Sequence, residues 1–288
     1  TYQWNLNLGG IALTWRGGLS LESDSTAFGG LSGLVVADDC NSLVAVSDAG
    51  RWFTANLAYD ARNHLNAISN AKLAPMLDSK GKPPRRKVDA DAEAIAALGK
   101  GKYLVGFESR TRTGTYDLGK SGFAARFQSL KSPKALSGGP SNGELESIGF
   151  FTDGPHKGRY LAVSEKNRDA AGNIRGWLWR KQKTVPVTIK RLADYDITDL
   201  ALLPGGDVLI LERSFSTTSL PGMAIRRFPS SAIKSKAVVA PTVIFEGRVP
   251  FDAIDNMEGI ARCSRGGETR VTIMSDNKFN TALQRTLL

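Results

Sequence analysis

Residues 144–150 read ELESIGF, and residues 160–165, which follow after a turn, read YLAVSE. Both runs have the length and composition of short β-strands, and the second ends on a carboxylate. The same pattern of two apolar strands around a turn recurs in stretches that begin at Leu31, Asp91, Ile197 and Asn256. An internal repeat of this kind indicates an architecture built from repeated units.

Equivalent positions of the five repeats hold Ser32, Glu93, Glu146, Asp199 and Glu258, which follow one another at intervals of 53 to 61 residues. This period suits a four-stranded blade, because such sheets bury their faces by packing radially. We therefore predict an all-β fold, a β-propeller of four-stranded blades, with five blades by this arithmetic.

The ends of the chain fill the remaining interval. The C-terminal strands and the N-terminal segment Gln3–Leu8 together make one more repeat length, which predicts a ring closed by strands from both termini. Six blades are the alternative, with a further blade between Trp52 and Pro84. The stretches rich in Gly, Pro and Ser are expected to be loops, so residues 1–288 form a single propeller domain.

The composition is that of a folded, basic protein. The 288 residues carry a formal net charge of +10, and 41% are hydrophobic against 23% charged, which argues against disorder. The basic residues are scattered and no recognition motif accompanies them, so we expect no nucleic-acid partner. The apolar stretches are far shorter than the roughly 20 residues that span a bilayer, so we expect no transmembrane segment. We expect a monomer.

The two cysteines, Cys40 and Cys263, are far apart and lack C-x-x-C spacing, which argues against a zinc site or a thioredoxin-like motif. Both follow the first strand of their repeat, and the first and fifth blades of a ring are neighbours. A disulfide between them would staple the closure. Two unpaired cysteines are the alternative, because equivalent turns can lie more than ~7 Å apart between Cα atoms.

Acidic residues recur at two places in each repeat. The first strand of a blade runs along the central channel and the second returns antiparallel, so the start of one meets the end of the other. The first set comprises Glu93, Glu146, Asp199 and Glu258, with Ser32 at the remaining place, and the second comprises Asp48, Glu108, Glu165, Glu212 and Asp276.

These nine carboxylates would repel one another unless positive charge lies among them. Calcium fits, because it takes six to eight oxygen ligands with flexible geometry. The predicted metal ligands are Glu93, Glu146, Asp199, Glu258, Asp48, Glu165 and Asp276. Basic residues follow the second set and could neutralise it or attract an anionic substrate: Arg51, Arg110, Lys166, Arg168, Arg213 and Lys278. The alternative is structural, with acids that bond neighbouring backbone and pair with these cations.

Other catalytic motifs are missing. His64 and His156 are the only histidines, and no G-x-S-x-G elbow is present, which disfavours serine catalysis. The phosphate-binding loop and the dinucleotide fingerprint are missing too, which excludes kinase, ATPase and dehydrogenase functions.

Several segments resemble the bacterial phytase-like family, also described as esterase-like activity of phytase: FGGLSGL at 28–34, VSDAGR at 46–51, DAEAI at 91–95, LESI at 145–148 and NMEGI at 256–260. The resemblance extends from about Phe28 to the end of the chain. It implies a β-propeller, a periplasmic or secreted location, and calcium-dependent hydrolysis of phosphate esters or other esters. Asp199 and Ser32 depart from the Glu of the other repeats, which leaves the number of ligands open.

Two functional classes follow. As a hydrolase, the chain would use Glu146 and Glu93 with a bound metal, while Arg51, Arg110 or Arg168 neutralises charge on a small anionic substrate. As a non-catalytic ligand-binding or envelope scaffold, the same mouth would hold a structural ion. The converging acids favour the first class, and the lack of an obvious channel histidine favours the second.

Overall fold

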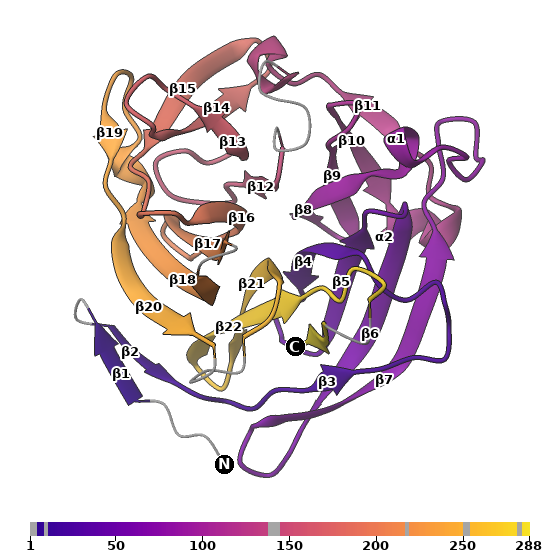
Figure 1. Cartoon of the computed structure of the whole chain (residues 1–288). Coiled ribbons are helices and arrows are strands. Elements are labelled where there is room, and N and C mark those ends of the chain that lie inside the picture. Colours follow the sequence, from indigo (N-terminus) through magenta and orange to yellow (C-terminus); the bar gives the residue numbers. More distant parts are fainter. Residues whose placement is uncertain (1–4, 9–10, 138–144, 217–218, 250–253, 281–283) are drawn as a thin grey trace.

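The computed structural model describes residues 5–8, 11–137, 145–216, 219–249, 254–280 and 284–288. Four antiparallel sheets follow one another along the chain and stand around a common centre, as Figure 1 shows. The first contains β4 (Leu31–Val36), β5 (Ser42–Ser47), β6 (Arg51–Tyr59) and β7 (Leu65–Pro75), and the second contains β8 (Ala92–Gly99), β9 (Lys102–Phe107), β10 (Arg112–Asp117) and β11 (Gln128–Leu130). The predicted all-β propeller is confirmed.

A short strand from the chain of the fourth sheet joins the edge of the third sheet. The third contains β12 (Ser147–Phe150), β13 (Tyr160–Arg168), β14 (Ile174–Arg180) and β15 (Lys183–Ile189), and the fourth contains β16 (Asp196–Leu202), β17 (Asp207–Ser216), β18 (Ser219–Pro229) and β20 (Thr242–Arg248). Between β18 and β20, the chain runs back to add β19 (Val238–Val239) to the third sheet, parallel to β15.

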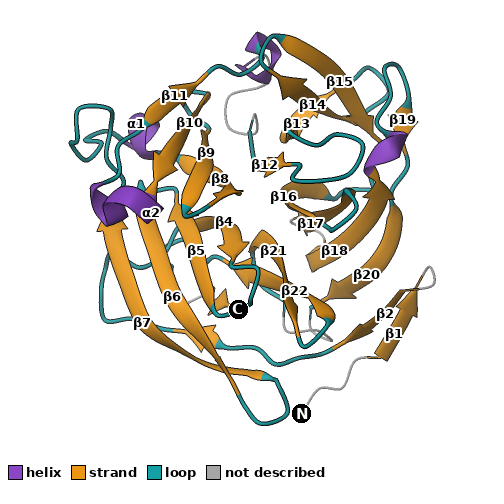
Figure 2. Ribbon diagram, turned by 180° about the vertical axis from the view of Figure 1, so that it is seen from behind, coloured by secondary structure: helices purple, strands orange, loops and turns teal. Residues whose placement is uncertain are grey.

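Three smaller pairings complete the strands of the described residues. β21 (Met257–Arg265) and β22 (Glu268–Ser275) form a hairpin, β23 (Thr286–Leu287) pairs with β3 (Ser20–Leu21), and β1 (Asn5–Leu8) pairs with β2 (Ile11–Thr14). The short helices are α1 (Lys87–Ala90) and α2 (Leu118–Ser121), with 3₁₀ turns at Gly122–Ala124, Lys134–Ser137 and Ser230–Ala232. Figure 2 shows these helical turns at the periphery, between the sheets.

The innermost strands contact one another in sequence around the centre. β4 packs against β8, β8 against β12, β12 against β16, β16 against β21, and β21 against β4. Gly33 of β4 and Gly259 of β21 permit this approach, because a Cβ atom would lie 2.8 Å from Ile95 N at Gly33 and 2.8 Å from Leu34 Cβ at Gly259. One end of every innermost strand therefore faces the same central space.

The terminal strands differ in part from the prediction. The N-terminal strand that meets the C-terminal β23 is β3, at Ser20–Leu21, whereas Asn5–Leu8 pairs with β2, and Gln3 and Trp4 lie outside the described residues. The stretch Trp52–Pro84, where the sequence allowed a further blade, supplies β6 and β7 of the first sheet and the loop after them.

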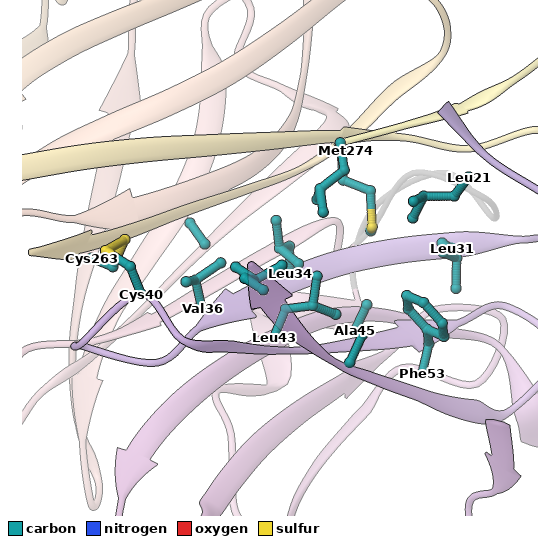
Figure 3. Close-up of a cluster of buried hydrophobic side chains, with 14 of the residues drawn as sticks. Leu21, Leu31, Leu34, Val36, Cys40, Leu43, Ala45, Phe53, Cys263 and Met274 are labelled. Carbon is teal, nitrogen blue, oxygen red and sulfur yellow. A yellow bond between two sulfur atoms is a disulfide. The ribbon is translucent and has the colours of Figure 1, made fainter. Parts of the chain in front are cut away.

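Apolar clusters fill the space between neighbouring sheets. Leu34, Val36 and Leu43 of the first sheet pack with Met274 of β22 in one such cluster, shown in Figure 3. At its edge Cys40 and Cys263 form a disulfide with Cα atoms 5.3 Å apart, which confirms the predicted pairing. Among the described residues, none of the helices has the length and apolar character needed to cross a membrane.

Candidate functional site

Bulges in the innermost strands set the first ring of side chains. In β8, Ala92 pairs with Phe107 and Ala94 with Gly106, so Glu93 is the extra residue. The register also shifts at Glu258 in β21, at Thr198 in β16, and between Leu31 and Leu34 in β4, where Ser32 and Gly33 lie. A bulge re-aims the side chain of the extra residue. The structural counterpart of Glu93 in the fourth sheet is therefore Thr198, and not Asp199.

The residues that follow the paired ends of the second strands form the second ring. Ser47, Phe107 and Ser275 occupy the paired ends, and a carboxylate follows each of them: Asp48, Glu108 and Asp276. In the fourth sheet the residue paired beside the bulge is Glu212, opposite Ile197, so the next residue, Arg213, which pairs with Asp196, holds the equivalent place. A guanidinium group thus stands where the other sheets carry acids.

Members of both rings, but not Thr198, line one cavity of about 240 Å³. The lining residues are Ser32, Asp48, Glu93, Glu108, Glu146, Glu165, Lys166, Arg213, Glu258, Asp276, Lys278 and Phe279. Of the described residues, seven carboxylates and three cations therefore face it. A cavity with this excess of negative charge attracts cations.

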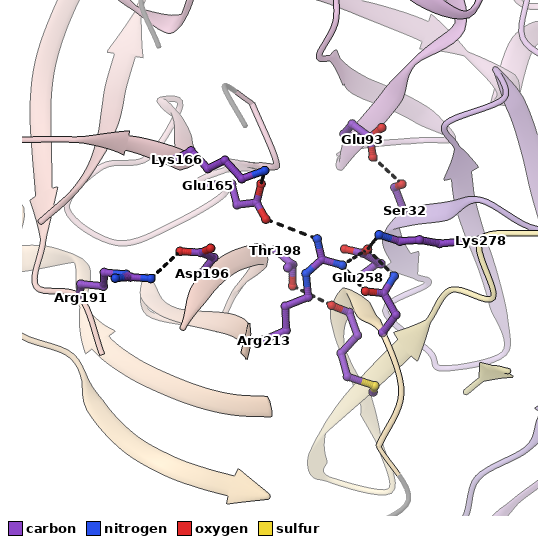
Figure 4. Close-up of polar contacts among 12 residues, drawn as sticks. Ser32, Glu93, Glu165, Lys166, Arg191, Asp196, Thr198, Arg213, Glu258 and Lys278 are labelled. Atoms are coloured by element: carbon purple, nitrogen blue, oxygen red, sulfur yellow. Dashed lines mark hydrogen bonds and ion pairs between the residues drawn. The ribbon is translucent and has the colours of Figure 1, made fainter. Parts of the chain in front are cut away.

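Arg213 neutralises one side of the cavity (Figure 4). Its guanidinium donates to the carboxylate of Glu258 and to the Oδ1 atom of Asn256, and its Nη2 atom lies 3.3 Å from Glu165 Oε1. Lys166 Nζ lies 2.9 Å from the second oxygen of Glu165. The nearby carboxylates raise the pKa of Arg213 even though burial opposes this. The protein therefore supplies its own cations to Glu165 and Glu258.

A second group of carboxylates lies close together. Asp91, Glu93 and Glu108 each offer an oxygen, and these atoms lie within 4.8 Å of one another. Ser32 Oγ donates to Glu93 Oε2 at 2.6 Å, and Lys87 Nζ lies 2.8 Å from Asp91 Oδ1. Glu146 makes no hydrogen bond or ion pair with the described residues. The acidic cluster of Asp91, Glu93 and Glu108 has the donor chemistry to hold a metal ion.

Two buried glutamates of the cavity have pKa values well above the ordinary value of a glutamate. Burial, followed by repulsion from Glu93, Glu165, Glu108 and Glu258, raises the pKa of Glu146 well above its ordinary value. Burial also raises the pKa of Glu93 well above its ordinary value, and nearby carboxylates add to the rise. Hydrogen bonds to an ionised carboxylate lower a pKa, and Ser32 supplies too little to reverse this. A cation at these two residues would relieve the repulsion.

Asp276 and Asp48 extend the acidic side. Asp276 accepts the N–H of Leu31 at 2.9 Å, yet burial raises its pKa to about 6. Asp48 pairs through Oδ2 with Lys87 Nζ at 2.7 Å, and its buried Oδ1 has no hydrogen-bond partner among the described residues. An orphaned buried carboxylate oxygen fits a site that receives a cation.

Asp199 and Glu212 lie outside the cavity lining. Asp199 is fully buried, and it accepts the N–H groups of Leu200 and Ile260 at 2.8 Å, which ties β16 to β21. Glu212 is fully buried in a two-point ion pair with Arg226. The strand register explains why neither side chain lines the cavity, because a shift of one residue moves a side chain to the other face of a strand. These two acids have the structural role that the sequence left as an alternative.

The arginines chosen from the sequence also lie away from the lining residues. Arg110 is exposed beside Asp89, Arg168 pairs with Asp196 at 2.5 Å, and Arg51 lies in β6, the third strand of its sheet. The sequence grouped Arg213 with these cations but did not select it. Asp91 and Phe279 were missed as well, because neither has a counterpart in every repeat.

A propeller whose innermost strands surround an acidic, cation-attracting cavity defines the class of this protein. The chain belongs to the Phytase-like family, described as "Esterase-like activity of phytase", whose model matches residues 26–279. This confirms the family indicated by the motifs. No curated protein matches the chain significantly.

Solved structures with a similar shape are distant. "Structure of U3-55K" has a TM-score of 0.47 at 7% identity and covers 94% of this chain and 97% of its own. "Crystal structure of RRP9 WD40 repeats" has 0.46 at 7%, with coverage of 94% and 96%. The Malassezia sympodialis allergen Mala s 1 has 0.44 at 13%, with coverage of 97% and 84%. With TM-scores below 0.5, these structures say nothing about what this chain binds.

Proposed function

We propose that this protein is an exported, calcium-dependent hydrolase of phosphate esters or other esters. The observation that supports this most is the pair Glu93 and Glu146, whose pKa values are raised, while the ion pairs of Arg213 with described residues are made to Glu165 and Glu258. A carboxylate with a raised pKa is suited to general acid–base work near neutral pH.

The residues that would hold calcium are Asp91, Glu93 and Glu108, with Glu146 and Asp48 beside them. Their hard oxygen atoms match the ligand preference of calcium, and the orphaned Asp48 Oδ1 offers another donor. Calcium, when bound, supplies positive charge that neutralises these carboxylates and polarises the oxygen of an ester. Glu165 and Glu258 are poorer ligands, because their partner Arg213 is 20% exposed, whereas Lys87, the partner of Asp91 and Asp48, is 57% exposed and can move away more easily.

Other side chains of the cavity would accept a proton, attract the substrate and position the acids. Among the described residues Glu146 has no hydrogen-bond or ion-pair partner, and it would accept a proton from an attacking water molecule. Lys166 and Lys278 have side chains that are 46% and 51% exposed, so their ammonium groups can meet an anionic substrate at the mouth. Arg213 positions Glu165 and Glu258 on the opposite wall.

We propose further that the ring has five blades. The hairpin β21–β22 packs between β16 and β4, and β23 lies against β22 while pairing with β3. Together these four strands would make the fifth blade from both ends of the chain. The Cys40–Cys263 disulfide supports a periplasmic or secreted location, since disulfides persist in oxidising compartments.

Turnover of para-nitrophenyl phosphate and para-nitrophenyl acetate tests the hydrolase. With calcium, we expect the wild type to hydrolyse at least one of them, and Glu146→Gln to lower kcat by about 100-fold or more because the proton acceptor is lost. Glu268→Gln is the control, since Glu268 lies in β22 and pairs with Arg16 away from the cavity. Equal rates for the wild type and Glu146→Gln would contradict the proposal.

One observation favours a non-catalytic alternative. His156 bonds to Ser230 O at 2.9 Å and His64 lies beside Asp60, so neither histidine is at the cavity. Calcium binding without turnover of any ester would favour a ligand-binding or scaffold propeller with a structural ion.

A further inference from the structure

An aromatic side chain stands at the edge of the acidic cavity. Phe279 follows β22 and lines the cavity together with Asp48, Asp276 and Lys278. It is 46% exposed, which is high for a large apolar side chain. Burial of apolar surface therefore does not explain why the ring is held there.

The backbone holds Phe279 in an unusual conformation. Lys278 has φ 45° and Phe279 has φ 56°, so two successive residues with side chains adopt the left-handed region. Such residues occur mainly where the surrounding structure enforces them, and they cluster at functional sites. Here Asn277 Oδ1 accepts the N–H of Phe279 at 3.0 Å, and Asn277 O accepts that of Asn280 at 2.7 Å.

The aromatic ring of Phe279 packs against the backbone of two glycines, Gly29 and Gly30. A Cβ atom at Gly29 would lie 2.9 Å from Phe279 Cδ1, and one at Gly30 would lie 2.7 Å from Cε2. Both glycines have positive φ values, 146° and 62°. The Gly29–Gly30 pair therefore forms a seat for the ring, and the rest of the ring stays open beside the charged groups.

We propose that Phe279 is a platform for an aromatic ring on the substrate of this site, so that the substrate class is an aryl ester or an aryl-bearing anion. The inference rests on the proposed function, because it assigns the substrate class of the same cavity. Aromatic rings prefer offset or edge-to-face contact with one another. The carboxylates and cations that share the lining with Phe279 would then face the anionic head of the ligand.

Binding of two non-hydrolysable anions tests the platform. Phenylphosphonate and methylphosphonate share a head group and differ in the ring, so their dissociation constants are measured by calorimetry on the full chain with saturating calcium. We expect the wild type to bind phenylphosphonate about tenfold more tightly. Phe279→Ala should abolish this preference, whereas Phe279→Trp should keep it.

Trp15→Ala is the matched control, because Trp15 is also 46% exposed but does not line the cavity, and this variant should keep the preference. Equal affinity of the wild type for the two anions, no binding of phenylphosphonate, or an unchanged preference in Phe279→Ala would each overturn the platform. The hydrolase is judged separately. A ring preference that Phe279→Ala removes, without turnover of any ester, keeps the platform and removes the hydrolase, while equal turnover of methyl and phenyl esters does the reverse.

Discussion

Replacing Arg213 by methionine is expected to lower the free energy of unfolding by about 3–5 kcal/mol. The change leaves Glu165 and Glu258 without their guanidinium partner, and their side chains are only 6% and 9% exposed. A buried carboxylate that loses its guanidinium partner is costly, and the contacts that remain, of Lys166 with Glu165 and of Lys278 with Glu258, come from side chains that are 46% and 51% exposed. Urea unfolding at pH 7 with a chelator present measures the effect.

Arg227→Met is the control for this prediction. Arg227 also lies in the fourth sheet, but its ion pair with Asp207 joins side chains that are 39% and 26% exposed. Pairs near the surface contribute about 0–1 kcal/mol. The double variant Arg213→Met with Glu258→Gln should recover part of the loss. Similar losses for Arg213→Met and Arg227→Met would show that Arg213 does not neutralise the cavity.

The calcium-free protein is expected to become less stable as the pH rises from about 4 to 7. Burial raises the pKa of Asp276 from 3.8 to about 6, so in this window the folded state holds a proton that the unfolded state has lost. Stability is then present below the unfolded pKa and is lost as the pH rises through the folded pKa. For Asp276, which is 4% exposed, the shift corresponds to roughly 3 kcal/mol. Glu93, Glu146 and Asp199 act in the same direction.

Calcium should reverse this trend, because metal ligands bind in their deprotonated form and affinity grows as protons leave. Urea unfolding at pH 5 and pH 7 measures how the free energy of unfolding changes with pH, with calcium and with a chelator. Asp276→Asn should reduce the change that is measured with the chelator. If the chelated protein gains stability between pH 5 and pH 7, the buried carboxylates are compensated within the protein and the account fails.

The propeller could be predicted because pairs of strand-like apolar segments recur along the sequence at similar intervals. The disulfide was expected between turns of neighbouring blades, and the structure forms it between Cys40, in the turn after β4, and Cys263, which lies within β21. The repeat singled out Glu93, Glu146 and Glu258, and the structure places all three in the cavity lining.

Register limited the prediction of the site. Asp199 was the nearest acid to the expected position, but the bulge in β16 falls at Thr198 and sends Asp199 into the contact with β21. The same shift of one residue exchanges Glu212 for Arg213 in the second ring. The pairing of strands determines such a shift of register, and the spacing of residues along the chain does not predict it. Phe279 depends on loop conformation and on the Gly29–Gly30 seat, which no periodic pattern reveals.

Calcium titration calorimetry of chelator-stripped protein, on the wild type and on Glu146→Gln, tests the central claim most directly. We predict calcium binding by the wild type, proton release near pH 6 seen as a heat that depends on the buffer, and affinity that Glu146→Gln weakens by roughly 10- to 100-fold. No calcium binding by the wild type, or equal affinity in Glu146→Gln, would contradict the account and leave the acidic rings as structural elements of the propeller.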